Sequence, residues 1–305
     1  MRAIIVHGGA WDIPDDLIED HKVGMSVALD AGHSVLSDGG SSLDAVQAAV
    51  ERMEEECIFD AGCGSFLNQA GDVEMDSAIM RGKDLALGSV AGIRNVRHPV
   101  RVARQVMERT GHCLLVGQGA TEFARSLGEE LIPSHELVSP RELQRWKENQ
   151  QNGFDPRSAF EANGKKPSDT VGAIAIDDNG DIAVATSTGG TPGKMVGRVG
   201  DSPLVGSGIY ADNASGGVAS TGYGEAIMKV CLARRVCEGI EAGMDPKTAA
   251  HTAIDHMFNR TGGRGGVIVL DKKGRLAWHF NTPRMAFGYV DMYAHKAIFV
   301  ANRDY

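Results

Sequence analysis

The character of the chain changes abruptly at Thr170. The segment from about Pro133 to Pro167 is long and charged, with little apolar periodicity. From Val171 to Ile176 small and β-branched residues alternate, which predicts a strand. A threonine at the start of a strand is ordinary, because threonine is a good strand former. If the Asp169–Thr170 bond were cut, however, Thr170 would carry a free α-amino group beside its hydroxyl, and one residue would supply both a nucleophile and a base.

Hydroxyl residues and glycines cluster in three motifs after this strand. They are Thr186-Ser187-Thr188-Gly189-Gly190, Gly197-Arg198-Val199-Gly200-Asp201-Ser202-Pro203 and Ser220-Thr221-Gly222-Tyr223-Gly224-Glu225. Hydroxyls, one arginine and one aspartate in a short span suit the hydrolysis of an amide in a small zwitterionic substrate. The 39 glycines of the chain lie in such loops and not in a repeat, so linker and collagen-like chains are excluded.

Composition limits the class of protein. A chain of 305 residues is long for one domain, yet a single large α/β domain remains possible, and the apolar share of 42% is enough for a core. A net charge of −9 argues against nucleic-acid binding. No apolar run approaches the roughly 18 residues of a membrane helix, and the stretch before His7 is too short for a secretory signal.

The cysteines point to a reducing compartment. There are five, at an odd count and without Cys-x-x-Cys spacing: Cys57, Cys63, Cys113, Cys231 and Cys237. This pattern argues against a disulfide framework and against a zinc site. We therefore expect reduced, mostly buried thiols in a cytoplasmic protein.

Strands and helices alternate in both halves without the regularity of a Rossmann fold. We expect strands at 3–6, 64–68, 73–80, 85–93, 113–116, 171–176, 182–186, 267–270 and 276–280, and helices at 16–36, 42–53, 99–109, 119–127, 141–151, 225–242 and 246–258, with Ser42 as the cap of the second helix. Alternating Glu74 and Asp76 suggest either paired carboxylates for acid–base chemistry or a strand with one wet face, and we prefer the second interpretation.

Taken together, the motifs resemble those of the plant-type (type 2) L-asparaginase and isoaspartyl peptidase family of N-terminal-nucleophile (Ntn) hydrolases. The resembling residues are His7-Gly8-Gly9-Ala10, Asp60-Ala61-Gly62-Cys63-Gly64-Ser65, Asp169-Thr170-Val171-Gly172-Ala173, Thr186 to Gly190, Lys194 to Arg198, Asp201 to Pro203 and Thr221 to Glu225. They span nearly the whole chain in the expected order. Only the segment before Thr170 has no pattern to match.

The resemblance implies one Ntn-hydrolase domain over residues 1–305, a four-layer αββα sandwich of the α/β (α+β) class. It implies self-cleavage between Asp169 and Thr170, giving an N-terminal subunit 1–169, with a mobile segment at about 133–169, and a C-terminal subunit 170–305. The expected product is an amidohydrolase that cleaves L-asparagine and β-aspartyl dipeptides without a catalytic cofactor. We expect a homo-oligomer, a dimer of such subunit pairs.

The resemblance also implies residue roles. Thr170 is the expected nucleophile, Thr188 its hydrogen-bond partner, and Thr221 with Gly222 the oxyanion hole. Arg198 is expected to bind the substrate α-carboxylate, with Asp201 and Gly224 on the α-ammonium, and Gly8, Gly9 and Asp60 to support the site. A structural sodium ion is expected on backbone carbonyls of Met53, Glu54, Glu56, Phe59, Ala61 and Cys63. Consecutive glutamates at 54–56 also favour a cation, because negative charge at a helix C-terminus opposes the macrodipole.

Asp60 departs from the family pattern, in which an asparagine commonly stands before Ala61. An ionised carboxylate cannot donate a hydrogen bond, and its charge would oppose a developing oxyanion. Asp60 is therefore expected either to be protonated through burial or to hold the Thr170 ammonium, unless its side chain points elsewhere.

Three other functions are weaker. The run from Thr188 to Met195 superficially resembles a phosphate-binding loop, but it lacks the first glycine and the hydroxyl residue after Lys194. A non-catalytic, uncleaved binding protein of the same fold would show one fragment in denaturing electrophoresis, whereas the enzyme would show two. Glycosylasparaginases also have an aspartate before the nucleophilic threonine, but their motif continues differently from Val171 to Ile174.

Overall fold

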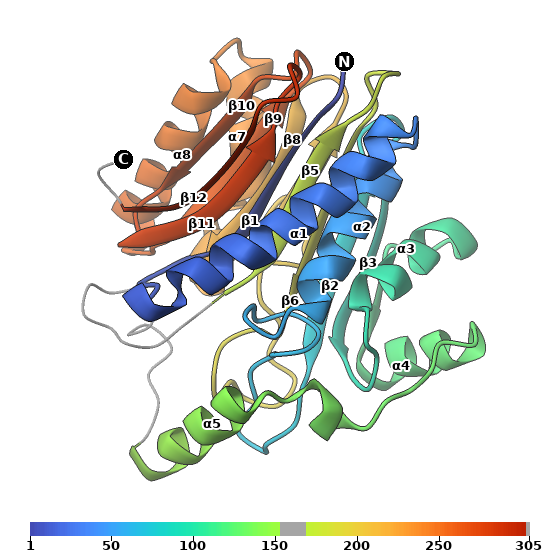
Figure 1. Ribbon diagram of the computed structural model, residues 1–305, viewed down its shortest axis with the longest axis vertical. Helices are drawn as coiled ribbons and strands as arrows, with labels where there is room; N and C mark the ends of the chain where they lie inside the picture. Colours follow the sequence, from blue (N-terminus) through green and yellow to red (C-terminus); the bar gives the residue numbers. More distant parts are fainter. Residues whose placement is uncertain (153–168, 303–305) are drawn as a thin grey trace.

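Two sheets stack face to face between outer helices in the computed structural model, which describes residues 1–152 and 169–302 (Figure 1). The larger sheet has eight strands in the order β12-β11-β1-β5-β6-β2-β3-β4, and the smaller has four in the order β10-β9-β8-β7. The strands are β1 (Ala3–Trp11), β2 (Met75–Arg81), β3 (Ala86–Ile93), β4 (Leu114–Val116), β5 (Val171–Ile176), β6 (Ile182–Thr188), β7 (Ile209–Asp212), β8 (Gly216–Gly222), β9 (Gly265–Asp271), β10 (Leu276–Phe280), β11 (Arg284–Val290) and β12 (Lys296–Asn302).

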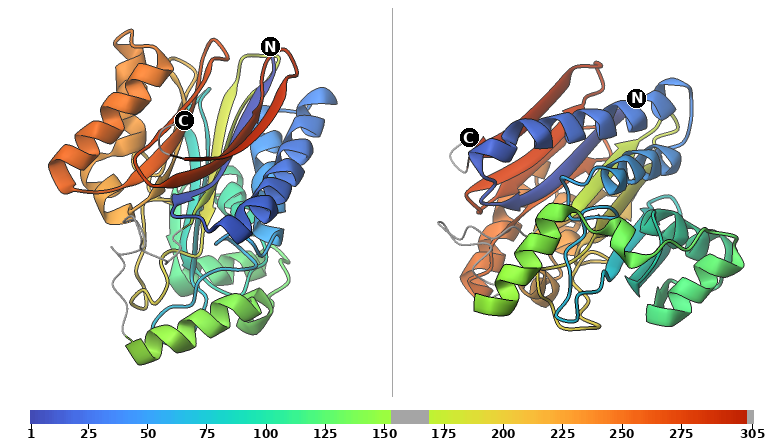
Figure 2. Two further views of the ribbon diagram at one scale, coloured as in Figure 1. Left: turned by 60° about the vertical axis from the view of Figure 1, so that its left-hand side comes forward. Right: turned by 60° about the horizontal axis from the view of Figure 1, so that its bottom comes forward.

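The helices cover the outer faces of the two sheets. They are α1 (Ile18–Ser37), α2 (Ser42–Glu55), α3 (Pro99–Arg109), α4 (Gly117–Ser126), α5 (Pro140–Asn152), α6 (Gly224–Val230), α7 (Leu232–Glu241) and α8 (Pro246–Thr261), with short 3-10 turns at Asp15–Leu17 and Ser134–Leu137. Helices α1, α2 and α3 pack on the larger sheet and α7 and α8 on the smaller one (Figures 1 and 2).

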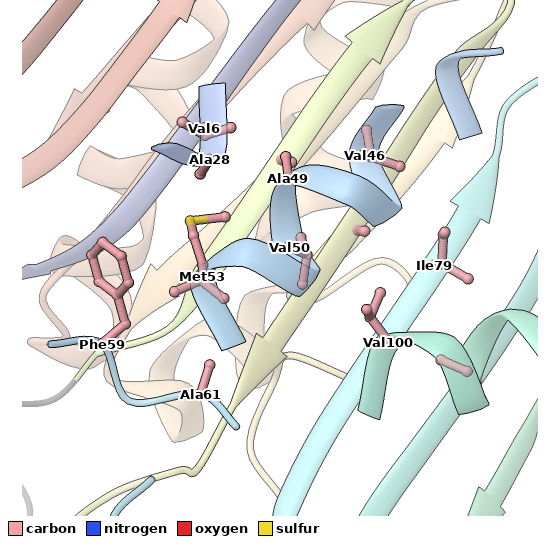
Figure 3. Packing of buried hydrophobic residues seen from close by; sticks show 14 of the residues in the cluster. Val6, Ala28, Val46, Ala49, Val50, Met53, Phe59, Ala61, Ile79 and Val100 are labelled. Carbon is pink, nitrogen blue, oxygen red and sulfur yellow. The ribbon is translucent and has the colours of Figure 1, made fainter. Parts of the chain in front are cut away.

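Alternation along the central strands explains this layering. In β1, Ile4 and Val6 join the apolar cluster beneath α1 and α2, whereas Ile5 joins the cluster between the two sheets. Both faces of such a strand are buried, so nearly every residue must be apolar or small. Figure 3 shows the outer cluster, in which Met53 of α2 and Phe59 after it pack near Val6. A third cluster fills the space between the smaller sheet and α7 and α8. The predicted four-layer αββα sandwich is thus confirmed.

Several element boundaries differ from the predicted ones. The cap of α2 is Ser41, one residue earlier than predicted, and its hydroxyl accepts from the Asp44 N–H at 3.1 Å. The predicted helix over 225–242 is two helices, because Cys231 between them has a left-handed φ of 50°. Leu67 and Val73 form only an isolated bridge in place of the first half of the predicted hairpin.

The segment before Thr170 is partly regular. Helix α5 continues to Asn152, and residues 153–168 of the predicted mobile segment lie outside the described residues. Its Trp146 side chain donates to the Asn68 carbonyl at 2.9 Å. Figure 2 shows α5 lying across loops at one end of the sheets. The predicted helix over 141–151 is thus confirmed as α5, which packs on the loop around Asn68, and the mobility of the segment stays a prediction.

The prediction of reduced, mostly buried cysteines is wrong in two respects, since two of the five are bridged and only Cys237 is buried. Cys57 and Cys63 form a disulfide, with their Cα atoms 4.8 Å apart. Cys113 and Cys231 are exposed free thiols and Cys237 is a buried one. Sequence spacing did not indicate the pair, because the loop that joins its members folds back on itself after α2.

Candidate active site

Three threonines face the space between the sheets at one end of their strands. Along β5 and β6, Ile174 and Val184 point into the apolar cluster between the sheets, and Thr170 and Thr188 have the same parity. On β8, Ala219 belongs to that cluster and Thr221 follows two residues later. All three threonines are nearly or fully buried.

Thr170 is held by contacts on both its hydroxyl and its amide. Its Oγ1 donates to Thr188 Oγ1 at 3.3 Å, and its backbone N–H donates to Asp169 Oδ1 at 2.8 Å. Thr188 Oγ1 also lies 3.1 Å from the Asp169 carbonyl oxygen and accepts from the Gly190 N–H at 2.9 Å. The hydroxyl of Thr188 therefore touches both Thr170 and the carbonyl of the bond before it.

The Asp169 carboxyl group is buried against glycine and histidine. A methyl group at Gly9, whose φ is +98°, would lie 1.8 Å from Asp169 Oδ1, so only glycine admits this approach. Burial raises the pKa of Asp169, partly offset by His21, whose Nε2 lies 3.8 Å from Oδ2. Gly8 instead faces Phe59 and Met25, away from this carboxyl group. Sequence reasoning missed His21, which carried no motif.

His7 is a second buried histidine beside the candidate nucleophile. It pairs with Gly172 across β1 and β5, and a methyl group at Gly172 would lie 2.4 Å from its Nε2. Burial lowers the pKa of His7 to about 3, so the ring is neutral. The ring fits here because the facing residue is glycine.

Asp60 lies next to Thr188. Its Oδ1 accepts from the Phe66 N–H at 2.8 Å and its Oδ2 lies 3.4 Å from Thr188 Oγ1. Burial raises the pKa of Asp60 well above its usual value, and repulsion from Asp169 and Glu142 adds to this. The Phe66 N–H and the Lys194 ammonium act in the opposite direction. The side chain thus points at the Thr188 hydroxyl and favours its protonated form.

Arg198 is already engaged by a side chain that sequence reasoning gave no role. Its Nε and Nη2 each donate to the Glu225 carboxylate at 3.0 Å. A guanidinium has five N–H donors, and this pair uses one edge of the fork. The Nη1–Nη2 edge keeps the donors needed for a second carboxylate. Glu225 therefore orients Arg198 and leaves it able to bind another anion.

Asp201 offers an acceptor close to Arg198. Its buried Oδ2 has no hydrogen-bond partner within residues 1–152 and 169–302. A methyl group at Gly224 would lie 2.8 Å from Asp201 Oδ1 and 2.9 Å from Arg198 Nη2, so Gly224 is tightly enclosed by both side chains. Burial raises the pKa of Asp201 to about 7, although Arg198 opposes the shift.

Thr221 and Gly222 end β8 beside this group. Thr221 Oγ1 is buried and finds no hydrogen-bond partner in the part of the chain that the structure describes. Burying a hydroxyl without a hydrogen-bond partner costs free energy, unless a bound ligand supplies the partner. Gly222 has a φ of +134°, and a methyl group there would lie 2.3 Å from the Gly265 Cα. This close approach of β8 to β9 requires glycine.

Glu74 and Asp76 fix the loop that carries Arg198 and Asp201. Glu74 Oε2 accepts from the Gly197 N–H at 3.0 Å, and Asp76 Oδ2 accepts from the Gly200 N–H at 3.2 Å. Both side chains are buried, so the predicted wet strand face is wrong. Asp76 pairs with Thr188 across β2 and β6. The arginine loop is thus tied to the strand position opposite Thr188.

Two backbone carbonyls, of Glu54 in α2 and of Phe59 in the loop after it, lie close to glycines of that loop. A methyl group at Gly62 would lie 2.3 Å from the Glu54 oxygen, and one at Gly64 would lie 2.6 Å from the Phe59 oxygen. The Glu54 oxygen accepts from the Cys63 N–H at 2.8 Å and keeps a second lone pair. The carboxylate of Glu54 points elsewhere, to His98 Nδ1 at 3.3 Å. The residues of the predicted sodium loop thus offer backbone carbonyls and not the Glu54 carboxylate, and the ion itself stays a prediction.

Comparison with known proteins agrees with this geometry. The family profile described as asparaginase matches residues 1–300. The chain belongs to the asparaginase family. The proteins named isoaspartyl peptidase/L-asparaginase from Xenopus laevis and Homo sapiens are both 46% identical to it, over 94% and 89% of this chain and 91% and 87% of their own lengths. A probable isoaspartyl peptidase/L-asparaginase from Drosophila pseudoobscura pseudoobscura is 46% identical over 94% of this chain and 92% of its own length.

The chain brings its predicted site residues into two groups. One consists of Thr170, Thr188, Asp169, Asp60 and Gly9, and the other of Arg198, Asp201 and Gly224. Asp76 connects them, because it pairs with Thr188 and accepts from the Gly200 N–H in the arginine loop. Among the described residues, no helix has the length and apolar character that crossing a membrane requires.

Proposed function

We propose that this chain is a self-processing threonine amidohydrolase that cleaves L-asparagine and β-aspartyl dipeptides and releases L-aspartate. The observation that carries the proposal is the contact of Thr170 Oγ1 with Thr188 Oγ1 at 3.3 Å, with Thr188 also 3.1 Å from the Asp169 carbonyl oxygen. A hydroxyl beside the peptide bond that precedes it is the geometry that intramolecular acyl transfer requires. The names of the relatives support the substrate class.

Self-cleavage begins with the Thr170 hydroxyl. Its oxygen attacks the Asp169 carbonyl carbon as its proton leaves through Thr188 Oγ1. The Thr188 hydroxyl, which contacts both the Asp169 carbonyl oxygen and Asp60 Oδ2, then governs how well that carbonyl oxygen accepts negative charge. The C–N bond breaks, the amine takes a proton, and water opens the resulting ester. The products are residues 1–169 and 170–305.

In the processed enzyme the new α-amine of Thr170 serves as the base. An α-amino group has a reference pKa of about 7.7–8.0, so no histidine is required near neutral pH. The Thr170 oxygen attacks the β-carbonyl of the substrate, and the oxyanion receives hydrogen bonds from Thr221 Oγ1 and the Gly222 N–H. The buried Thr221 hydroxyl lacks a partner among the described residues, which supports this assignment.

Charge complementarity selects the aspartyl part of the substrate. The Nη1–Nη2 edge of Arg198 binds the α-carboxylate while Glu225 holds the other edge. Asp201 Oδ2 and the Gly224 carbonyl accept from the α-ammonium. These contacts require a free α-amine and a free α-carboxylate, so ordinary α-peptides are excluded and the β-linked leaving group can vary.

A panel of substrates tests the proposal. Purified processed protein is given L-asparagine, a β-aspartyl dipeptide, the α-aspartyl dipeptide of the same composition, and a glycosylated asparagine, and aspartate release is measured. We expect hydrolysis of the first two and none of the α-dipeptide. Hydrolysis of the glycosylated asparagine alone would favour a glycosylasparaginase-like amidase. No hydrolysis of any β-linked substrate would overturn the proposal.

The proposal also covers a bound sodium ion, the oligomeric state and the location of the protein in the cell. A sodium ion is proposed on the carbonyls of residues 53–63, and metal analysis after dialysis into potassium-free and sodium-free buffers tests it. A dimer of subunit pairs is proposed and is tested by light scattering. A cytoplasmic location stays a prediction, to be checked by fractionation of the source cells.

A further inference from the structure

The Cys57–Cys63 disulfide closes the loop that carries Asp60. The two cysteines are six positions apart, and Asp60 lies midway between them. Cys57 is exposed and Cys63 is half-buried, whereas Asp60 is almost fully buried. The loop therefore presents one sulfur to solvent and one carboxyl group to Thr188.

The same loop is fastened to the site by hydrogen bonds. The Asp60 carbonyl oxygen accepts from the Gly189 N–H at 3.0 Å, next to Thr188. The Cys63 N–H donates to the Glu54 carbonyl at 2.8 Å. With the disulfide closed, the positions of Asp60 and Gly189 relative to the end of α2 are fixed by both ends of the loop.

A cavity of about 510 Å³ reaches Cys57 from solvent. The carboxylates of Asp20 and Glu56 and the guanidinium of Arg141 line it. Arg141 Nη2 already donates to the Ile58 carbonyl at 3.0 Å, so its charge is turned toward the loop. With two carboxylates and one guanidinium, the cavity favours the entry of an uncharged or cationic small molecule over an anionic one.

We propose that this disulfide is a modification site for small thiols, entered through the cavity at Cys57, and that opening it releases Asp60 from Thr188. A thiolate attacks the Cys57 sulfur, a mixed disulfide forms there, and Cys63 leaves as a thiolate that takes a proton from water. A second thiolate attacks the mixed disulfide. The external thiol is oxidised to its disulfide, and Cys57 and Cys63 become thiols.

The effect on the site rests on the proposed function. Without the bridge the loop is fixed by its hydrogen bonds and by the sodium ion proposed on its carbonyls, and a displacement of about 1 Å near reacting groups can slow catalysis up to a hundredfold. We expect reduction to slow hydrolysis of a β-aspartyl dipeptide about tenfold at a pH below the raised pKa of Asp60, where the carboxyl group is protonated and donates to Thr188, and the hydrogen bonds that remain limit the displacement.

Thiol counting on the full-length protein tests the site itself. Protein kept without reductant and then denatured should give three free thiols, from Cys113, Cys231 and Cys237. The native protein treated with cysteamine should give all five, and an acid quench at early times should trap cysteamine on Cys57. At equal thiolate concentration cysteamine should react faster than mercaptoethanesulfonate, and high salt should reduce the difference. Five thiols before treatment, an adduct on Cys63 in place of Cys57, or a bridge that opens only after unfolding would overturn the proposal.

Two variants separate the modification from the proposed function. Cys57→Ser should be slow with or without thiol, because its bridge is absent already, and Cys113→Ser should keep the thiol response of the wild type. Equal turnover of oxidised and reduced wild type would refute the link to Asp60. If neither state hydrolyses any β-aspartyl substrate, the proposed function fails, while the thiol count still decides whether the bridge is a reactive site.

Discussion

Replacing Asp60 by asparagine should raise turnover at pH values above the raised pKa of the Asp60 carboxyl group. The asparagine amide would keep an acceptor for the Phe66 N–H and would donate permanently to Thr188 Oγ1. The wild-type carboxyl group can donate only while it is protonated. Burial and neighbouring carboxylates raise its pKa, so the proton is present at low pH and is lost as the pH rises through that raised value. The wild-type rate should therefore fall on the alkaline side, and the variant rate should not.

The size of the effect follows from the distances. Asp60 Oδ2 lies 3.4 Å from Thr188 Oγ1, which in turn lies 3.3 Å from Thr170 Oγ1. The carboxylate is therefore within about 7 Å of the attacking oxygen. At an effective dielectric constant of ~20, like charges at this separation repel by about 2 kcal/mol, roughly thirtyfold in rate. The variant should exceed the wild type by up to this factor above the raised pKa and match it well below.

The assay is a pH–rate profile of aspartate release from a β-aspartyl dipeptide. Rates are divided by the processed fraction seen in denaturing electrophoresis, because Asp60 also touches the processing site. Asp60→Ala is the matched control: it removes the charge without supplying a donor, so it separates repulsion from loss of a hydrogen bond. If the profiles of wild type and Asp60→Asn superimpose, the carboxyl group takes no part in the reaction and the reasoning is refuted.

The remaining predictions concern the substrate contacts and the oxyanion. Arg198→Lys keeps the charge but loses the fork, and should raise KM by about tenfold or more with a smaller change in kcat; an unchanged KM would argue against carboxylate binding there. Glu225→Gln should raise KM in the same direction but less, since Arg198 keeps its charge and loses only its orientation, and equal kinetics would show that Arg198 needs no such partner. Thr221→Val, once processed, should lose about 10²–10³ in kcat, and full turnover would remove Thr221 from the oxyanion hole. The wild-type KM should rise as the pH falls through about 7, because Asp201 then takes a proton and no longer attracts the α-ammonium. Asp201→Asn should show a high KM at every pH. If the KM of this variant still depended on pH, the titrating group would be a residue other than Asp201.

The strands on either side of the Asp177–Asp181 turn could be predicted from the sequence, because periodicity depends on local patterns, whereas the layering was implied by the family resemblance. The alternation along 171–176 and 182–188 determines which side chains enter the space between the sheets, and the positions of Thr170 and Thr188 follow from it. The break between α6 and α7 could not be predicted, because a cysteine carries no sequence signal for the left-handed φ that Cys231 adopts.

Contacts between loops that are distant in the chain could not be predicted from the sequence either. Glu74 and Asp76 looked like a wet strand face, yet the arginine loop covers them and supplies N–H donors from Gly197 and Gly200. A buried carboxylate that accepts backbone N–H groups has the same sequence pattern as an exposed one. His21 and the Cys57–Cys63 bridge were missed for the same reason, since each partner lies on a different segment or behind a turn.

The central claim is that the chain cuts itself before Thr170, and the mass of the purified protein tests it most directly. Wild-type protein, expressed whole and incubated near neutral pH, should separate under denaturing conditions into fragments 1–169 and 170–305, the second with an N-terminal threonine by sequencing. Thr170→Ala, prepared in the same way, should give one intact chain. An intact wild type without a second N-terminus, or a Thr170→Ala chain cut at the same bond as efficiently as wild type, would contradict the account.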